Sequence, residues 1–288
     1  MIDAHHHLWD LTAVHYPWLM AKDTPRFFGD PAPIQRNYLL DEFRKVAAAQ
    51  GISGSVHIQV GAEDGWAEAK WVQKIAEENP DWPLAQVVFC DLTASDLGTQ
   101  LDRFKTLSTV RGVRQIVGRA PGEDTITGTN TLLDDPKFAE GLQEAGRRGL
   151  SFDLQLIPEL MEKTARVLGE APDINVALCH AGSPHDRSDA GLKDWESKLR
   201  TLSTLPHVTC KLSGLGMFQH NWNTDNFRPI IDTCLDQFGP DRCMFGSNFP
   251  VDSLYSDYAT LVNAHRQIVP DAMHSQVFHT TAATFYGL

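Results

Sequence analysis

The sequence predicts an α/β fold, a single-domain (β/α)8 TIM barrel that spans residues 1–288, and three observations support this prediction. Short apolar runs alternate with longer helix-like segments, which indicates parallel strands joined by helices. Eight such units in a chain of this length are typical of a barrel. The first strand also ends in histidines, where an open doubly wound sheet typically has a glycine-rich phosphate loop.

The predicted strands are short apolar runs separated by turn residues and polar segments. They cover residues 2–8, 54–60, 84–91, 110–117, 151–157, 176–182, 208–214 and 243–250.

The predicted helices have apolar residues that recur at intervals of three and four. They include residues 64–79, 97–107, 136–148, 158–169, 194–205 and 227–238, and residues 278–288 are expected to form the closing helix. Asp135 and Pro136 mark one helix start, while Gly149, Gly169 and Gly239 mark helix ends. The aromatic and proline-rich residues 10–33 are too many for a simple turn and are expected to cover the barrel mouth.

The composition excludes several classes of partner. A formal net charge of −12, with no local block of Lys and Arg, argues against nucleic acid. The chain begins without a signal-peptide pattern and has no apolar stretch long enough to span a bilayer, so we expect a cytoplasmic protein with no membrane partner. The five scattered cysteines are expected to be reduced and mostly buried. A homo-oligomer is compatible with these features.

Three consecutive histidines lie at the C-terminal end of the first predicted strand. Because side chains alternate along a strand, Asp3, His5 and His7 are expected to share the inward face, while His6 faces the helix layer and is structural. Barrel active sites lie at the C-terminal ends of the strands, and two imidazoles at i and i+2 can bind one metal ion. The alternative is that these histidines are incidental, either solvated or packed in the core.

Polar side chains also end three later strands. His180, just before a glycine and a proline, is expected to point into the barrel mouth, where an imidazole can act near neutral pH. Strand seven ends with Lys211 and Ser213, and strand eight with Asn248. Four strand ends therefore bring polar groups to one end of the barrel.

These strand ends resemble those of the amidohydrolase superfamily. The motifs are Asp-x-His-x-His on strand one, His-x-Gly-x-Pro on strand six, Lys-Leu-Ser-Gly on strand seven and Gly-Ser-x-x-Pro-Val on strand eight. Residues 9–10, 16–19, 112–114 and 152–155 resemble the amidohydrolase-2 branch more narrowly. That branch includes sugar lactonases such as L-fuconolactonase and L-rhamnonolactonase, and pyrone-dicarboxylate and sulfomuconolactone hydrolases. The resemblance covers essentially the whole chain.

The resemblance implies a hydrolase acting on a carboxylic ester bond, which opens a small polar lactone by adding water to its carbonyl. The lactone is a sugar lactone or a carboxylated lactone of the muconolactone or pyrone type. Metal-using relatives hold a divalent cation, usually zinc, on the strand-one histidines, so His5, His7 and His180 are the expected ligands. Such a cation lowers the pKa of water and polarises the carbonyl. Other members work without added metal, and their histidines can polarise the carbonyl by hydrogen bonding.

The chain departs from this pattern at strand eight, where Asn248 replaces the aspartate that usually acts as the base. An amide cannot take a proton from water, but it can bind a metal weakly or hydrogen-bond the substrate. His180 and Asn248 remain catalytic candidates, and Asp252 and Asp153 are the candidate bases. A structural role for either carboxylate is the alternative.

Substrate recognition is expected from polar and aromatic residues at the strand ends and in the loops, because polar lactones require guanidinium, amide and aromatic groups. The candidates are His57, Gln59, Arg114, Gln155, Lys211, Trp18 and Phe249, with Arg119 and Trp222 nearby in the loops. Each of these side chains has an alternative structural role in internal hydrogen bonding or lid packing.

Two other functions are compatible with the sequence. Metal-dependent decarboxylases of the same superfamily share the strand-one and strand-six histidines. A binding protein that kept the fold and lost its base would also carry these motifs, with Asn248 as the lesion.

Overall fold

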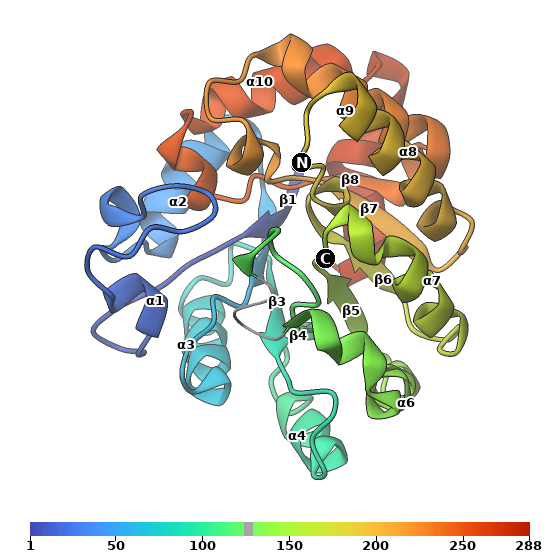
Figure 1. Cartoon of the computed structure of the whole chain (residues 1–288). Helices are drawn as coiled ribbons and strands as arrows, with labels where there is room; N and C mark the ends of the chain where they lie inside the picture. Colours follow the sequence, from blue (N-terminus) through green and yellow to red (C-terminus); the bar gives the residue numbers. More distant parts are fainter. Residues whose placement is uncertain (124–128) are drawn as a thin grey trace.

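Eight parallel strands form one sheet in the order β1 to β8, which curls into a barrel surrounded by helices (Figure 1). The computed structural model describes residues 1–123 and 129–288. The strands are β1 (Ile2–His6), β2 (Gly54–Ile58), β3 (Leu84–Phe89), β4 (Val110–Arg114), β5 (Ser151–Leu154), β6 (Val176–Leu178), β7 (Val208–Leu212) and β8 (Cys243–Phe245). The predicted fold class is confirmed.

Each strand begins at its predicted residue and ends earlier than predicted. The clearest case is β6, which stops at Leu178 because Cys179–Gly182 form a 3-10 turn. Within that turn His180 adopts a φ of 56°, outside the extended region. The apolar pattern continues past the last ladder hydrogen bond because the side chains beyond it are still buried, so hydrophobicity overestimates the strand length.

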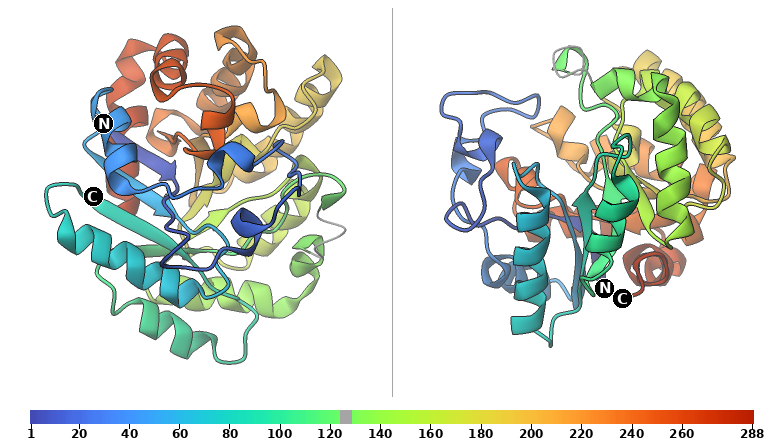
Figure 2. Two further views of the ribbon diagram at one scale, coloured as in Figure 1. Left: turned by 90° about the vertical axis from the view of Figure 1, so that its left-hand side faces the viewer. Right: turned by 90° about the horizontal axis from the view of Figure 1, so that it is seen from below.

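The helices pack around the outside of the barrel, and two further views show this layer (Figure 2). They are α1 (Pro17–Met20), α2 (Leu40–Ala48), α3 (Gly65–Glu78), α4 (Leu97–Phe104), α6 (Pro136–Arg147), α7 (Met161–Gly169), α8 (Asp189–Ser203), α9 (Thr224–Phe238), α10 (Tyr258–Ile268) and α11 (Thr281–Tyr286). A 3-10 turn, Pro158–Leu160, precedes α7.

Capping residues explain most helix boundaries. The Asp135 side chain accepts a hydrogen bond from the Lys137 amide and starts α6, as predicted. Helix α8 begins at Asp189 rather than at residue 194, because the Ser188 hydroxyl caps it by accepting from the Gly191 amide. Helix α7 ends at Gly169, the residue at which the sequence predicted its end.

Helix α11 closes the N-terminal end of the barrel. Tyr286 and Ala282 pack with interior residues of β1 to β3, including Ala4 and Val56. The predicted closing helix over residues 278–288 is present as α11, preceded by one π-helical turn, Gln276–Thr280. This packing covers the N-terminal end of the barrel, and ligands of such barrels bind at the C-terminal end.

An irregularity in β1 decides which of its side chains face inward. The pairing of β1 with β2 shifts register between Asp3 and His6. Ala4 packs in the barrel interior, whereas Asp3 accepts a hydrogen bond of 2.9 Å from Tyr258 of α10 in the helix layer. The expectation that Asp3 shares a face with His5 is wrong, because the irregularity resets the alternation before the histidines.

Backbone hydrogen bonds join β1 to the chain just after β8. The His7 amide donates to the Phe249 carbonyl, and the Asn248 amide donates to the His5 carbonyl, each at 2.7 Å. These bonds bring Asn248 beside the strand-one histidines. These two backbone hydrogen bonds therefore fix the position of Asn248 relative to His5 and His7.

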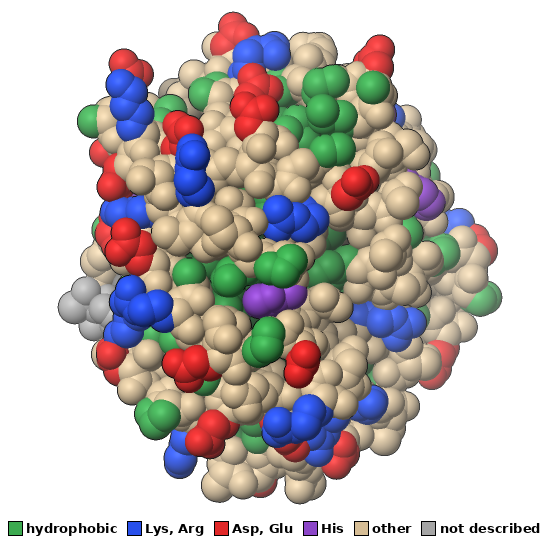
Figure 3. Space-filling view, turned by 90° about the vertical axis from the view of Figure 1, so that its right-hand side faces the viewer, with side chains coloured by type: hydrophobic (Ala, Val, Ile, Leu, Met, Phe, Trp, Pro, Cys, Tyr) green, Lys and Arg blue, Asp and Glu red, His purple; other side chains and the backbone are tan. Residues whose placement is uncertain are grey.

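The segment 10–33 lies across the barrel mouth, as the left view of Figure 2 shows. An antiparallel bridge between Trp9 and Tyr38 joins the residues on either side of this segment. Within the described residues, no helix is long and apolar enough to cross a membrane. On the face shown in Figure 3, acidic and basic side chains are interspersed without a large patch of one sign. All five cysteines are buried and free, as predicted.

Candidate active site

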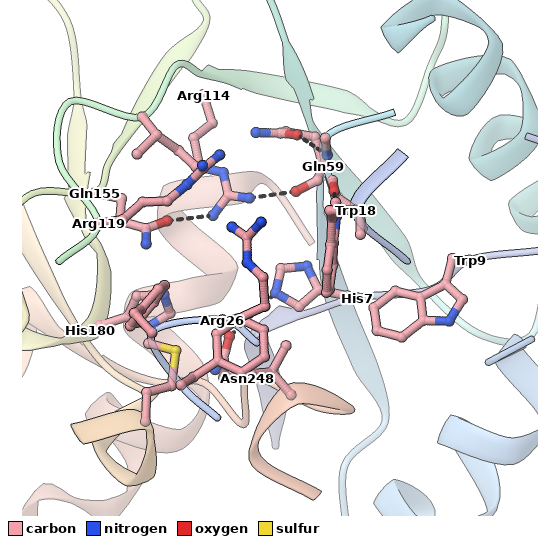
Figure 4. Close-up of a pocket in the computed structure, with 17 residues that line it drawn as sticks. His7, Trp9, Trp18, Arg26, Gln59, Arg114, Arg119, Gln155, His180 and Asn248 are labelled. Atoms are coloured by element: carbon pink, nitrogen blue, oxygen red, sulfur yellow. Dashed lines mark hydrogen bonds between the residues drawn. The ribbon is translucent and has the colours of Figure 1, made fainter. Parts of the chain in front are cut away.

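A pocket with about 630 Å³ of empty space, part of it open to solvent, lies at the C-terminal end of the barrel (Figure 4). Its lining comprises His7, Trp9, Trp18, Arg26, Phe27, Phe28, Gln59, Val60, Gly61, Arg114, Ile116, Arg119, Gln155, His180, Met217, Asn248 and Val251. Four of these residues come from segment 10–33, which forms one wall.

Three histidines come together at this end of the barrel. The ring centroid of His5 lies 5.1 Å from that of His7 and 4.6 Å from that of His180. The Nδ1 atom of His180 lies 3.0 Å from the Ser213 hydroxyl, which fixes the ring. His6 points away and stacks on Phe43 of α2, with 3.9 Å between ring centroids. The predicted separation of His6 from the other histidines is therefore confirmed.

All three clustered imidazoles are held in the neutral form. Burial lowers the pKa of His7 to about 3 and lowers the pKa of His5 and of His180 well below the usual value. Positive neighbours, including Arg114, act in the same direction. Neutral imidazoles retain a lone pair, which is the form that binds metal ions.

Close approach of backbone explains two glycines beside the histidines. A Cβ on Gly246 would lie 2.7 Å from the Cβ of His5, and a Cβ on Gly214 would lie 2.4 Å from Nδ1 of His180. Gly214 also has a φ of +61°, which favours glycine. Only hydrogen as a side chain lets the two imidazoles occupy these positions.

The contact between His7 and Asn248 joins two hydrogen-bond acceptors. The Nδ1 atom of His7 lies 2.8 Å from the Ile58 carbonyl, so this nitrogen carries the proton. In the neutral ring Nε2 is then an acceptor, and it lies 3.3 Å from Oδ1 of Asn248. Two ligands of one tetrahedral zinc ion are separated by roughly 3.3–3.5 Å. The pair fits a shared cation better than a hydrogen bond.

Asp252 lies behind Asn248 and outside the pocket lining. It is buried in the 3-10 turn Val251–Leu254. Burial raises the pKa of Asp252 to about 7, and interactions with Asn248 and the Gly216 backbone partly oppose this rise. Among the described residues, neither carboxylate oxygen of Asp252 nor the amide nitrogen of Asn248 has a hydrogen-bond partner. Asp252 therefore lies near Asn248 and does not line the pocket.

Asp153 and Lys211 form a buried ion pair below the pocket, and neither lines it. Asp153 also accepts a hydrogen bond of 2.8 Å from Tyr286 of α11. We expected Lys211 to contact the substrate and Asp153 to act as the base. Neither residue lies in the pocket lining, so the expected position of each is wrong. Both side chains contact Tyr286 of α11, the helix that covers the N-terminal end of the barrel.

A second group of possible metal ligands includes this Asp153. Among the described residues, ligand atoms of His5, Asp153 and Cys179 all lie within 4.8 Å of one another. However, the Lys211 ammonium already neutralises Asp153, and burial raises the pKa of Cys179 to about 12, which keeps its thiol protonated. A cation there would compete with the ammonium, so this group is the poorer site.

The histidines at the mouth fit a cation better. Among the described residues, neither ring nitrogen of buried His5 has a hydrogen-bond partner. The His7 and Asn248 acceptors face one another, and His180 completes a set of nitrogen and oxygen donors of the kind that zinc accepts. These four residues are the ones that would hold a divalent metal.

Amide and guanidinium groups form the pocket wall that faces the histidines and Asn248, as Figure 4 shows. Arg114 donates a hydrogen bond of 3.1 Å to the side-chain oxygen of Gln155. It donates a second hydrogen bond to the backbone carbonyl of Gln59. Trp18 is part of the pocket wall that segment 10–33 forms. Its indole nitrogen donates a hydrogen bond of 2.6 Å to the Val60 carbonyl. Five expected substrate contacts, Gln59, Arg114, Gln155, Trp18 and Arg119, therefore border the pocket.

Three other expected contacts do not border it. His57 lies in the helix layer, 3.5 Å from Glu68 of α3, because Val56 and Ile58 take the inward positions of β2. Phe249 packs against Tyr258, with 5.0 Å between ring centroids. Trp222 likewise stacks on Phe227, at 4.2 Å. These are corrections to the expected positions of His57, Phe249 and Trp222.

The sequence reasoning missed several lining residues, of which Arg26 carries the most chemistry. Its guanidinium pairs with Glu123 at 3.2 Å and lies 5.5 Å from the Trp18 ring centroid. Met217, Trp9 and Ile116 were also missed. The length and aromatic content of segment 10–33 predicted a lid, but nothing in its local sequence shows which of its charged side chains turns inward.

The fold and site define a (β/α)8-barrel protein with a histidine cluster at its C-terminal mouth. The chain belongs to the amidohydrolase family, whose model matches residues 2–288. It is 36% identical over 292 residues to an uncharacterised protein of Sinorhizobium fredii, covering 99% of this chain and 98% of that one. It is also 30% identical over 304 residues to an L-fucono-1,5-lactonase of Burkholderia multivorans, covering 100% of this chain and 96% of the lactonase.

Solved structures agree with this assignment. An amidohydrolase from Burkholderia multivorans with bound zinc superposes with a TM-score of 0.84 at 26% identity, over 100% of this chain and 99% of that one. A 5-carboxyvanillate decarboxylase from Sphingomonas paucimobilis shares the fold, with a TM-score of 0.66 at 14% identity, over 100% of this chain and 99% of that one.

Proposed function

We propose that this protein is a zinc-assisted hydrolase that opens a small polar lactone by adding water to its ring carbonyl. The observation that carries the proposal is the set of neutral imidazoles and one amide oxygen facing a pocket with guanidinium and amide donors on its other wall. Family membership and the lactonase relative at 30% identity support this reaction class.

The residues divide into two groups with different tasks. His5, His7, His180 and Asn248 would hold a divalent metal, which when bound lowers the pKa of water and polarises the carbonyl. Arg114, with Gln155, orients the polar substituents of the lactone.

Asn248 acts as an oxygen donor and not as a proton acceptor. Among the described residues the pocket lining contains no Asp or Glu, so the site has no carboxylate base in direct contact with substrate. Asp252 is buried near Asn248 and does not line the pocket, so it does not contact the substrate directly. A divalent metal held by the histidines and Asn248 would lower the pKa of the attacking water; the water oxygen would bond to the carbonyl carbon as the ring C–O bond breaks, and the proton lost by the water would pass to the leaving ring oxygen.

The test is a panel of lactones assayed by pH-stat with zinc-loaded and chelated protein, beside aromatic and unsaturated carboxylic acids assayed for carbon dioxide release. We expect zinc-dependent ring opening and no carbon dioxide. Release of carbon dioxide without ester opening would establish the decarboxylase instead. Lactone binding without turnover under every metal condition would establish a binding protein.

A further inference from the structure

A second cluster of possible metal ligands lies below the pocket and is called the lower cluster here. Among the described residues, ligand atoms of His5, Asp153 and Cys179 lie within 4.8 Å of one another, and all three side chains are buried. A thiolate paired with a carboxylate attracts a cation more strongly than neutral imidazoles and an amide do. Neither Asp153 nor Cys179 lines the pocket, so a cation held there would not meet the substrate.

Lys211 places a positive charge inside the lower cluster. Its ammonium donates to Oδ2 of Asp153, and the Cys179 sulfur lies 3.9 Å from the same oxygen. The ammonium also donates a hydrogen bond of 2.8 Å to the carbonyl of Ala4, the residue before His5. Lys211 is fully buried, so solvent and salt screen its charge only weakly. The ammonium therefore occupies the space beside Asp153 that a bound cation would require.

His5 belongs both to the lower cluster and to the proposed metal site at the pocket mouth. Neither of its ring nitrogens has a hydrogen-bond partner among the described residues. A neutral imidazole carries a proton on one nitrogen and a free lone pair on the other, so it can bind one metal ion at a time. His5 can therefore serve the mouth or the lower cluster, but not both together. Whatever blocks the lower cluster also keeps His5 available at the mouth.

We propose that Lys211 is a positioning residue for the metal, whose ammonium keeps a divalent cation out of the lower cluster and leaves His5 to bind one at the pocket mouth. The inference rests on the metal site of the proposed function and adds the residue that selects between two places for the metal. Without this charge, the metal binds His5, Asp153 and the thiolate of Cys179. The thiol proton then passes to solvent, as it does when a metal binds cysteine.

Absorption spectra with Co²⁺ in place of zinc distinguish the two sites. A thiolate ligand gives cobalt an intense near-ultraviolet charge-transfer band, which imidazole and amide ligands do not give. We expect wild-type protein to bind cobalt without this band and Lys211→Met to bind cobalt with it. Adding Cys179→Ala to Lys211→Met should remove the band, which assigns it to this sulfur. Lys74→Met, at an exposed lysine of α3, is the matched control and should give the wild-type spectrum.

Metal content and activity should separate in Lys211→Met. Elemental analysis should show that this variant retains zinc, while kcat/KM for ring opening falls by at least about 100-fold because the metal lies away from the substrate. Zinc should raise the thermal unfolding temperature of Lys211→Met more than that of the wild type, since the metal replaces the charge lost beside Asp153. Lys211→Gln keeps a hydrogen-bond donor for Asp153 without the charge, and it provides the same test if Lys211→Met fails to fold. Cys179→Ala alone should leave zinc affinity unchanged.

Three results would overturn the inference. They are a thiolate band in the wild-type protein, a loss of zinc affinity in Cys179→Ala alone, and no thiolate band in a folded Lys211 variant. In the last case lactone hydrolysis still stands if the wild type opens lactones with zinc. If the wild type binds no cobalt but a Lys211 variant gives the band, exclusion by Lys211 is supported and the metal-assisted reaction is rejected.

Discussion

Nε2 of His7 lies 3.3 Å from Oδ1 of Asn248, and in the neutral state neither atom has a hydrogen to donate. The relationship results from two backbone hydrogen bonds that fix the chain after β8 against β1. Under the proposed function, this pair would supply two of the metal ligands in a chain that has Asn248 where the resemblance leads us to expect an aspartate. An amide oxygen replaces the carboxylate as a donor, although it cannot replace it as a base.

Substitution of Asn248 by aspartate tests this interpretation. Asn248→Asp adds a negative charge at the same oxygen position and should raise zinc affinity roughly 10- to 100-fold. Asn248→Leu removes the donor and should lower zinc affinity. Competition with a chromogenic chelator measures both changes. Equal zinc affinity in the wild type and both variants would show that Asn248 is not a ligand.

The histidine tract provides its own internal comparison. His5→Ala and His7→Ala should each lose zinc, because each removes one of two donors from the same strand. His6→Phe keeps a ring of similar size against Phe43 and should retain zinc. Elemental analysis of purified protein, with thermal unfolding to check folding, gives the measurement. Full zinc content in both alanine variants contradicts the assignment.

Gly246, which packs against His5, should tolerate no larger side chain. Gly246→Ala places a methyl group 2.7 Å from the Cβ of His5, so the ring or the β8 backbone must move. We expect a loss of about 1–3 kcal/mol of unfolding free energy and reduced zinc content. Gly169→Ala, at the end of α7 with no heavy atom within 4 Å, is the control and should be neutral. If both variants unfold and bind zinc alike, the packing argument fails.

The barrel and much of its mouth were predictable because both depend on local patterns. Strand starts coincided with apolar runs, and the separation of His6 from His5 and His7 followed from strand periodicity. His180 was predictable from the glycine and proline that turn the chain beyond β6.

The remaining differences depend on features that no short sequence window contains. The irregularity in β1 turned Asp3 to the helix layer, and its position depends on pairing with β2. Lys211 and Asp153 were expected in the pocket, but their mutual attraction below it involves strands far apart in sequence. The inward turn of Arg26 depends on Glu123 and Trp18, which lie in other segments of the mouth.

His265 should make stability depend on pH. Burial lowers the pKa of His265 to about 4, whereas the unfolded chain protonates it near 6.5. Between these values the unfolded state binds more protons, so the free energy of unfolding falls as pH decreases. Removing this histidine by His265→Asn should reduce the loss between pH 7 and pH 4.5 by about 2–3 kcal/mol.

Urea unfolding across that pH range measures the effect. His279→Asn, at an exposed histidine, is the control and should follow the wild-type profile. Identical pH profiles for wild type and His265→Asn would show that His265 is not held neutral by folding.

The ion pair between Lys211 and Asp153 should show strong energetic coupling, because both side chains are fully buried. Lys211→Met leaves a buried carboxylate and Asp153→Leu leaves a buried ammonium, so each single variant should lose about 3–5 kcal/mol of unfolding free energy. The double variant removes both charges and should lose much less than the sum. A double-mutant cycle by urea unfolding measures the difference. Additivity within about 0.5 kcal/mol would mean that the two charges act independently, and the layer below the pocket would then be held by packing with Tyr286.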